Sequence, residues 1–156
     1  MTAGEVGLVI SLITWAIILW NTRALAFRTE TRALCEKIYT IDASVSENAI
    51  GLWVSDMKIS QAEVERLLIQ IGRLEIYLQH LESRESAFKL PDNLLAEYRG
   101  SLTHSIESAA SLPENEKLDA ANKIAEDSTR LQQHIETSYL NTYLTFFKRN
   151  RMGLRK

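Results

Sequence analysis

Residues 6–20 read VGLVISLITWAIILW and contain no charged side chain. Ser11 and Thr14 are the only hydroxyl-bearing residues in this run. With its flanks from Gly4 to Asn21, the segment makes about 27 Å of helix at about 1.5 Å per residue, which is close to the shortest helix that crosses a bilayer. The sequence therefore predicts a transmembrane anchor over residues 1–22.

Two other interpretations of this run fit less well. A cleaved secretory signal begins with basic residues, whereas the only charged side chain before this run is Glu5. Ala24-Leu25-Ala26 imitates a cleavage site, but Arg23 stands directly before it. The core helix of a small protein keeps a polar stripe, whereas apolar residues cover every face of this segment. An uncleaved anchor is the preferred interpretation.

The charges around the anchor predict its orientation. Arg23, Arg28, Arg32 and Lys37 follow the apolar run, and no basic residue precedes it. Positive side chains close to a span stay in the cytoplasm, so we expect the N-terminus outside and the rest of the chain at the cytoplasmic side of an inner membrane. The single Cys35 agrees with a reducing compartment, and we expect it to be a small buried residue.

One face of the anchor carries small or hydroxyl-bearing residues. Gly4, Gly7, Ser11 and Thr14 follow one another at spacings of three, four and three. Small residues in such a stripe allow two membrane helices to approach closely. This face is the predicted site of self-association, and we expect a homo-oligomer.

Apolar residues continue past the anchor at alternating steps of three and four, which indicates helix. The pattern runs without a break from Trp20 to about Met57, so the anchor is expected to continue as one long helix. Asn48 falls in this seam between Val45 and Leu52. A buried asparagine in a coiled seam fixes register or oligomer number, and Asn48 is predicted to have this role.

Three more helices follow at clear boundaries. Ser60-Gln61-Ala62-Glu63 is a capping box and starts a second helix that should end near Phe88. Pro91 starts a third helix reaching about Ala110, and Pro113 starts a fourth. Short connections make successive helices antiparallel neighbours. The predicted fold is all-α, with a single transmembrane helix that continues into a long cytoplasmic helix of an antiparallel four-helix, coiled-coil bundle over residues 23–149.

The C-terminal end combines aromatic and basic side chains, although the chain has a net charge of −2. Residues 150–156 are expected to form a basic, membrane-proximal tail. Together with two arginines after the anchor, this end is predicted to contact the anionic lipids of the inner leaflet. Nucleic acid is a disfavoured alternative, because the bundle should return this end to the membrane. The predicted lipid contacts are Arg23, Arg28, Phe146, Phe147, Lys148, Arg149 and Arg151.

The opposite end of the bundle is predicted to bind a protein partner. The third helix, of about 19 residues, is too short to reach the connection between the first two. The apolar run at the end of the first helix would then be exposed, and such a surface is typical of an interaction site. Ordinary core packing of the same run is the alternative. The predicted partner-binding tip consists of Ile50, Trp53, Val54 and Met57.

The sequence contains no recognisable catalytic motif. His80, His104 and His134 fall on three predicted helices, but none belongs to the Glu-x-x-His pattern of di-metal bundles. Glycine-rich phosphate loops and paired cysteines are also missing from the sequence. We therefore expect no cofactor, no metal and no enzymatic activity.

Three functions remain open from the sequence alone. The preferred one is a membrane-anchored scaffold that holds itself or a partner at the cytoplasmic face. A membrane-perturbing, pore-forming effector is the main alternative, with Ser11 and Thr14 lining the pore. A sensor or enzyme that uses the three histidines is the third.

Overall fold

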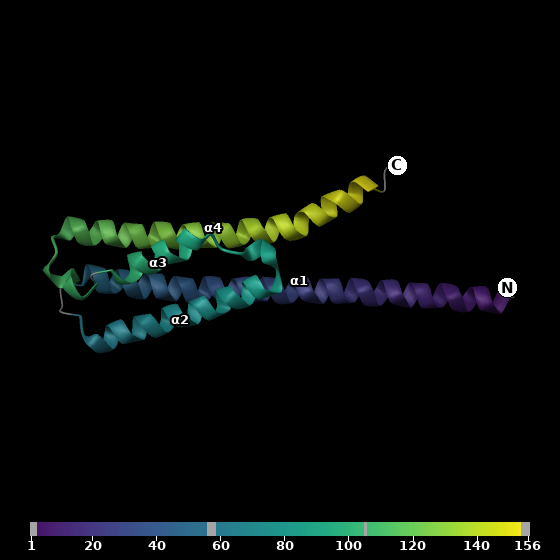
Figure 1. Ribbon diagram of the computed structural model, residues 1–156, viewed down its shortest axis with the longest axis horizontal. Coiled ribbons are helices and arrows are strands. Elements are labelled where there is room, and N and C mark those ends of the chain that lie inside the picture. The colour runs from purple at the N-terminus through teal and green to yellow at the C-terminus, as the bar shows by residue number, and fades with distance from the viewer. Residues whose placement is uncertain (1–2, 56–58, 105, 154–156) are drawn as a thin grey trace. The chain divides into compact units, whose positions relative to one another are not determined.

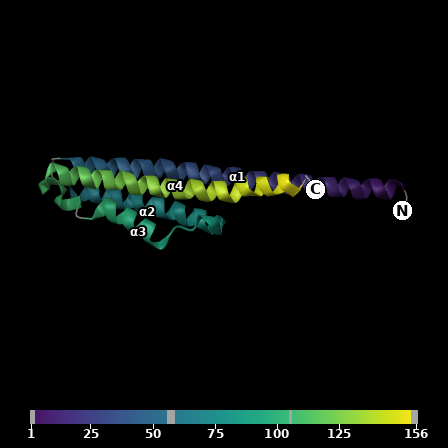
Figure 2. The ribbon, with the colours of Figure 1, turned by 90° about the horizontal axis from the view of Figure 1, so that it is seen from above.

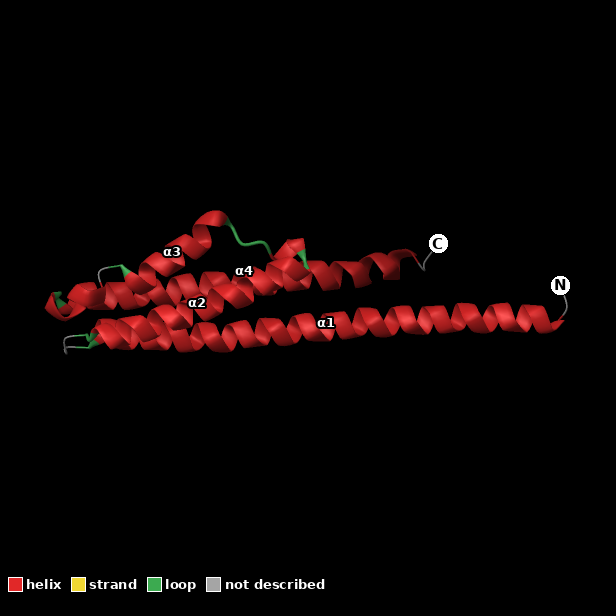
Figure 3. Cartoon of the chain, turned by 60° about the horizontal axis from the view of Figure 1, so that its bottom comes forward, coloured by secondary structure: helices red, strands yellow, loops and turns green. Residues whose placement is uncertain are grey.

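The computed structural model describes residues 3–55, 59–104 and 106–153, with side chains described except at residues 3–5, 92 and 144–153. Every element in these ranges is helical, which confirms the all-α prediction (Figure 1, Figure 3). The α-helices are α1 (Ala3–Val54), α2 (Gln61–Arg84), α3 (Asp92–Thr103) and α4 (Glu114–Gly153), and the short 3-10 helices are η1 (Ser86–Phe88) and η2 (Ile106–Ser111). The chain divides into two units, residues 1–33 and 34–156.

The first unit is helical from Ala3 onward and belongs to α1. Its apolar side chains between Val6 and Trp20 are all exposed. Among the described residues, α1 is the one helix that is long and apolar enough to cross a membrane. The predicted anchor is therefore a helix of suitable length and composition.

The second unit is built around one continuous core. Residues 34–54 of α1 lie beside α2, α3 and α4 in two perpendicular views (Figure 1, Figure 2). Each of these helices contributes side chains that are almost fully buried, and burial of one such side chain stabilises the fold by about 1.5–3 kcal/mol. The largest of them include Ile38, Val45, Leu67, Leu74, Leu81, Phe88, Leu102, Ile124, Leu131 and Ile135.

Contacts between α1 and α4 give the relative direction of these helices. The Tyr39 hydroxyl donates a hydrogen bond to Glu136 Oε2 at 3.0 Å. Further along α1, the Lys117 ammonium donates to the Ser55 carbonyl oxygen at 3.4 Å. The contacting residue numbers on α4 decrease as those on α1 increase, so these parts of α1 and α4 are antiparallel.

The start of α2 is fixed by the predicted capping box. Ser60 Oγ accepts a hydrogen bond from the Glu63 N–H at 3.3 Å, and Glu63 Oε2 accepts from the Ser60 N–H at 2.8 Å. Both bonds satisfy donors that a helix start leaves without partners. Hydrogen bonds from the Ser60 backbone and side chain also hold the pKa of Glu63 below its ordinary value.

Helix α3 is shorter than predicted and ends at Thr103. Gly100 and the hydroxyl residues that follow it are weak helix formers. The Ser101 hydroxyl donates to the Tyr98 carbonyl oxygen at 2.8 Å, and the Thr103 hydroxyl donates to the Arg99 carbonyl oxygen at 2.9 Å. After a turn, the chain continues as η2 to Ser111. Helix α3 and η2 together therefore cover almost the whole range predicted for the third helix.

Burial along α1 departs from the predicted seam after Ile38. Positions 42, 49 and 53 are buried, whereas Asn48 is exposed and Leu52 is only partly buried. The prediction that Asn48 lies in a buried seam is wrong. A strict 3.5-residue repeat drifts by about 20° per heptad from a straight α-helix, and this drift moves Asn48 out of the core. Its amide donates instead to Gln70 Oε1 on α2 at 2.9 Å.

Candidate functional site

The predicted packing face of the anchor is open in the structure. A side chain added at Gly7 would meet no atom within 4 Å. Ser11 and Thr14 are exposed, and each hydroxyl donates to a carbonyl of its own helix, on Gly7 and Ile10 respectively, at 2.9 Å. Gly4 lies among the residues whose side chains are not described. Self-association through this face stays a prediction.

The predicted lipid-contacting residues lie at both ends of the chain. Arg23 is exposed and Arg28 is partly buried. Helix α4 continues to Gly153 and so includes residues 150–153 of the predicted tail, while residues 154–156 lie outside the described residues. The side chains of Phe146, Phe147, Lys148, Arg149 and Arg151 lie outside those that the structure describes. Lipid contact stays a prediction.

The predicted partner-binding tip is partly core. Trp53 is 5% exposed and belongs to the core cluster, and Ile50 packs partly buried against it. Val54 is 48% exposed, and Met57 lies outside the described residues. The prediction that Trp53 is an exposed anchor is wrong.

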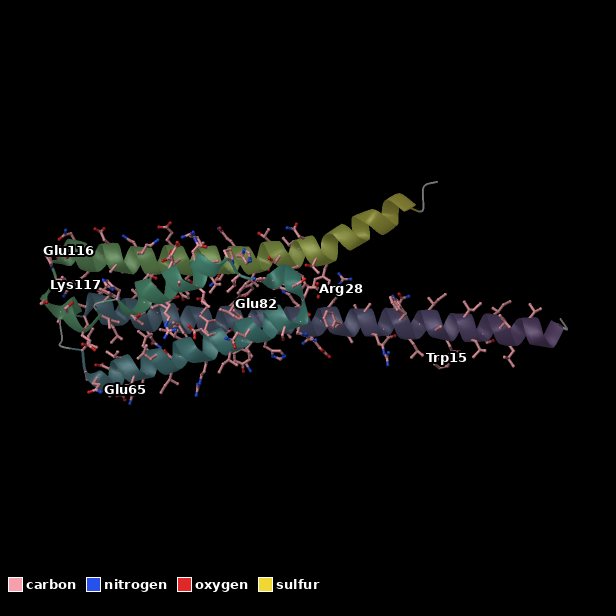
Figure 4. All side chains as sticks on the ribbon, viewed as in Figure 1. Trp15, Arg28, Glu65, Glu82, Glu116 and Lys117 are labelled. Carbon is pink, nitrogen blue, oxygen red and sulfur yellow. The ribbon has the colours of Figure 1, made fainter. Side chains whose placement is uncertain are left out.

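The connection between α3 and α4 explains why this tip is covered. The chain continues through η2 before α4 begins, and Lys117 in the first turns of α4 reaches the Ser55 carbonyl oxygen at the end of α1. Figure 4 marks Glu116 and Lys117 at this start of α4. The same figure shows Trp15 standing out from α1, in agreement with its exposure.

A buried carboxylate lies at the centre of the second unit. Asp42 on α1 is fully buried and accepts three hydrogen bonds from two other helices. Tyr98 Oη on α3 donates to Oδ1 at 2.5 Å, while Ser128 Oγ and Gln132 Nε2 on α4 each donate to Oδ2 at 2.7 Å. Ser46 Oγ donates to the Asp42 carbonyl oxygen at 2.8 Å and lies 2.9 Å from the Tyr98 hydroxyl. These five side chains tie three helices together at one point.

The surroundings of Tyr98 favour its neutral, protonated form. The three donors to Asp42 are all uncharged groups. Burial of the Tyr98 phenol, followed by the nearby charge of Asp42 and the hydrogen bond to it, raises the pKa of Tyr98 well above its ordinary value. Hydrogen bonds to a charged group contribute about 1.5–3 kcal/mol each, so the cluster contributes to both stability and helix alignment.

The sequence analysis missed this cluster, although a signal for it was present. Asp42 lies four residues after Ile38 and three before Val45, which places it on the buried face of a 3.6-residue helix. Ser128 lies four residues after Ile124 on α4, and Gln132 lies three residues before Ile135, so both are close to its apolar seam. A buried acid on one helix and polar seam residues on another are complementary, and that pairing was the available signal.

A second buried carboxylate belongs to Asp127, which directly precedes Ser128 on α4. Asp127 Oδ1 accepts from Lys123 at 3.0 Å and from Arg130 at 3.4 Å. Arg130 also donates to Glu97 on α3 at 3.1 Å, so this chain of ion pairs links α3 to α4. The hydrogen bond and charge of Asp127 raise the pKa of Lys123. Here the acid is paired with cations, unlike Asp42.

An open groove of about 600 Å³ runs between α1 and α2 in the second unit. Its walls combine aliphatic, aromatic and basic side chains, and no acidic side chain lines it. The lining includes Lys37, Ile41, Val45, Arg73, Ile76 and Tyr77. Apolar side chains and two cations therefore lie together in this groove.

The three histidines do not gather at one place. His80 and His104 are exposed, and His134 is partly buried with its Nε2 3.2 Å from the Lys89 carbonyl oxygen. Within the described ranges, no three residues of the types His, Cys, Asp and Glu are close enough together to hold a metal ion. Cys35 is fully buried, as expected from its sequence position.

Comparisons with protein-family models, with curated proteins and with solved structures find no match to this chain.

Proposed function

We propose that the chain is a single-pass membrane protein whose antiparallel four-helix bundle holds itself or a protein partner at the cytoplasmic face of an inner membrane. The anchor would be α1 up to about residue 22, with the N-terminus outside. This function requires no catalysis, because anchoring and helix packing suffice for it.

One observation carries this proposal: the apolar run of α1 is entirely exposed. None of the 18-residue apolar window is buried within the structure. Large exposed apolar surfaces on water-soluble proteins are rare, and transferring them from water to an apolar phase is favourable by about 25 cal/mol per Å². The Ser11 and Thr14 hydroxyls donate to carbonyl oxygens of their own helix, so neither donor would lack a partner inside a bilayer.

The buried polar cluster around Asp42 supports a structural role for the second unit. Asp42 and Tyr98 are inaccessible to a dissolved substrate, because they are 0% and 1% exposed. Polar groups that are buried and satisfied by hydrogen bonds rigidify a core. A rigid bundle is suited to presenting a binding surface at a fixed place beside the membrane.

Membrane attachment is tested by expressing the full chain in bacteria and separating membranes from soluble protein. We expect the chain in the membrane fraction, resistant to alkaline carbonate, which removes peripheral proteins. Arginine substitutions at Leu12 and Ile13 should release it, because each charged residue near the middle of a span costs about 2.5–3.5 kcal/mol. Alanine at the same two positions is the matched control and should stay in the membrane. Extraction of the unmodified chain by carbonate would contradict the proposal.

Orientation is tested with reporters fused to either end. Alkaline phosphatase is active only outside the inner membrane, so it should be active at the N-terminus and inactive at the C-terminus. The opposite result would refute the orientation, which rests on Arg23, Arg28 and Arg32 following the anchor.

The pore-forming alternative is separated from the scaffold by an ion-leakage measurement. Purified chain is incorporated into vesicles that contain a potassium-sensitive dye. The scaffold proposal predicts no leakage above that of empty vesicles. Leakage that disappears when Ser11 and Thr14 are both replaced by alanine would replace the scaffold with the pore.

A further inference from the structure

The groove between α1 and α2 is open along two helices that run in opposite directions. Asn48 contacts Gln70, whereas Lys37, earlier on α1, lies over the ring of Tyr77, later on α2. Past Gln70 the groove continues into a second hollow, whose lining includes Leu52 and one residue of each charge, Glu63 and Arg66. From Lys37 to Leu52 the groove follows about 22 Å of α1, at about 1.5 Å per residue, which is the length of a helix of about fifteen residues.

The charges at the wider end of this groove have one sign. Lys37 Nζ lies 4.8 Å from the centre of the Tyr77 ring, and Arg73 lines the same hollow. Both cations are exposed, and neither forms an ion pair with any residue that the structure describes. No carboxylate lines this hollow, so its two cations are available to acidic groups of a partner.

The apolar floor of the groove continues onto the outer face of α2. Ile76 is 65% exposed and Ile69 is 59% exposed, and their spacing of seven places them on one stripe of the helix. Gly72 lies between them, and a side chain added there would meet no atom within 4 Å. A glycine inside a helix costs about 1 kcal/mol relative to alanine. Packing within the described chain does not require glycine at this position, and the open space leaves room for another helix.

We propose that this α1–α2 groove binds an amphipathic helix of a partner protein that carries an aliphatic stripe flanked by acidic residues. Aliphatic side chains of this helix would pack against Ile41, Ile76 and the space before Gly72, while its carboxylates pair with Lys37 and Arg73. An amphipathic helix lying in a hydrophobic groove is a recurrent mode of recognition. The proposal rests on the scaffold function above and names the partner chemistry of that scaffold.

The charge pattern favours a different protein over a second copy of this chain. In an antiparallel pair of α2 helices centred on Gly72, the Arg73 side chains of both copies would face each other across the seam. Like charges in such positions are unfavourable. An acidic helix meets the same surface without this repulsion.

The test measures binding of two synthetic helical peptides of about fifteen residues to the full chain in zwitterionic nanodiscs. Both peptides carry the same leucine stripe at helical spacing, and the flanking positions are glutamate in one and lysine in the other. Fluorescence anisotropy is recorded, with empty nanodiscs subtracted. We expect the acidic peptide to bind at least tenfold more tightly than the basic one.

Substitutions in the groove then identify the site. Arg73→Glu should weaken the acidic peptide about fivefold, because one favourable exposed pair is lost and one repulsive pair is gained. Lys37→Glu combined with Arg73→Glu should reverse the preference between the peptides. Lys89→Glu has the same charge change outside the groove and should leave both affinities unchanged. Ile76→Asp should weaken both peptides more than tenfold, while helicity by circular dichroism stays that of the unmodified chain.

Three results would overturn the proposal. One is equal binding of the acidic and basic peptides, and another is an equal effect of Arg73→Glu and Lys89→Glu. The third is efficient disulfide dimerisation of the Ile76→Cys variant, which would assign the groove to a second copy, since Cys35 is buried. Failure of the scaffold function is distinguishable, because a chain that carbonate extracts from membranes would still show the peptide preference.

Discussion

Replacing Tyr98 by phenylalanine removes one hydroxyl from the buried cluster and leaves the ring in place. The Tyr98 hydroxyl is the only donor to Asp42 Oδ1 among the described residues, at 2.5 Å. After the substitution, Asp42 keeps its bonds from Ser128 and Gln132 on Oδ2, but Oδ1 is left buried without its donor. The helix α3 also loses its polar connection to α1.

The size of this effect follows from the charge of the acceptor. A hydrogen bond to a charged group contributes about 1.5–3 kcal/mol to stability. For a chain of this length, each 1 kcal/mol lowers the melting temperature by about 2–4 °C. We therefore expect a loss of about 2 kcal/mol and of about 4–8 °C at neutral pH. Tyr77→Phe is the matched control and should change stability by less than about 0.5 kcal/mol.

The same substitution predicts a specific dependence on alkaline pH. The folded state raises the pKa of Tyr98 above that of the unfolded chain, which is about 10. The stability that this proton contributes is therefore complete below about pH 10 and is lost as the pH rises further, by about 1.4 kcal/mol per pH unit. Phenylalanine has no proton to lose. The advantage of the unmodified chain over Tyr98→Phe should vanish between about pH 11 and pH 12.

Urea unfolding of both chains in a neutral detergent, followed by circular dichroism from pH 7 to pH 12, measures these differences. Other groups that titrate in this range are shared by both chains and cancel in the comparison. A loss below about 0.5 kcal/mol at pH 7 would refute the contribution of the bond. A difference between the two chains that stays constant up to pH 12 would refute the raised pKa of Tyr98.

Five further substitutions test other parts of the fold. Trp53→Ala should lower the free energy of unfolding in urea by about 3–5 kcal/mol, and Val54→Ala by less than about 1 kcal/mol, because only Trp53 is buried. Equal effects of the two substitutions would show that Trp53 is exposed, as the sequence predicted. Ser60→Ala should lower the free energy of unfolding by about 1 kcal/mol through loss of the capping box, and an unchanged value would show that the cap is dispensable. Gly72→Ala should stabilise the isolated chain by about 1 kcal/mol, since its side chain has open space, and destabilisation would reveal a hidden contact. Gly7→Leu should dissociate detergent-solubilised oligomers in light scattering if the anchor face assembles them, and an unchanged mass would exclude that face.

The buried Asp42 cluster and the α1–α2 groove have complementary roles in the proposed function. Asp42 and its donors fix α1 against α3 and α4 from inside the unit. The groove lies on α1 and α2, where cations and aliphatic side chains remain available to a partner. A rigid core behind an open groove keeps the groove in one shape, and preorganisation of this kind reduces the entropy that binding must offset.

The sequence by itself determined the local features of this protein. The charge-free run of fifteen residues, taken with its flanks from Gly4 to Asn21, suffices to predict a helix of about membrane-spanning length, because length and apolar composition are properties of the segment alone. The capping box at Ser60 and the break at Pro113 were also readable, since helix ends depend on bonds within a few residues. The all-α class followed from the three-four spacing of apolar residues.

Only the tertiary structure decided which positions of these helices meet. A drift of about 20° per heptad changes little over one or two turns of a helix. Over the longer distance to Asn48 and Trp53 it matters, because Asn48 is exposed and Trp53 is buried, the reverse of the prediction. The break after Thr103 depends on a balance of weak preferences, and it lets η2 and α4 cover the end of α1. The donors to Asp42 lie 56, 86 and 90 residues away in the sequence, so no local pattern could assign them. Burial and pairing are properties of several helices together, and for that reason they appear only when the chain is folded.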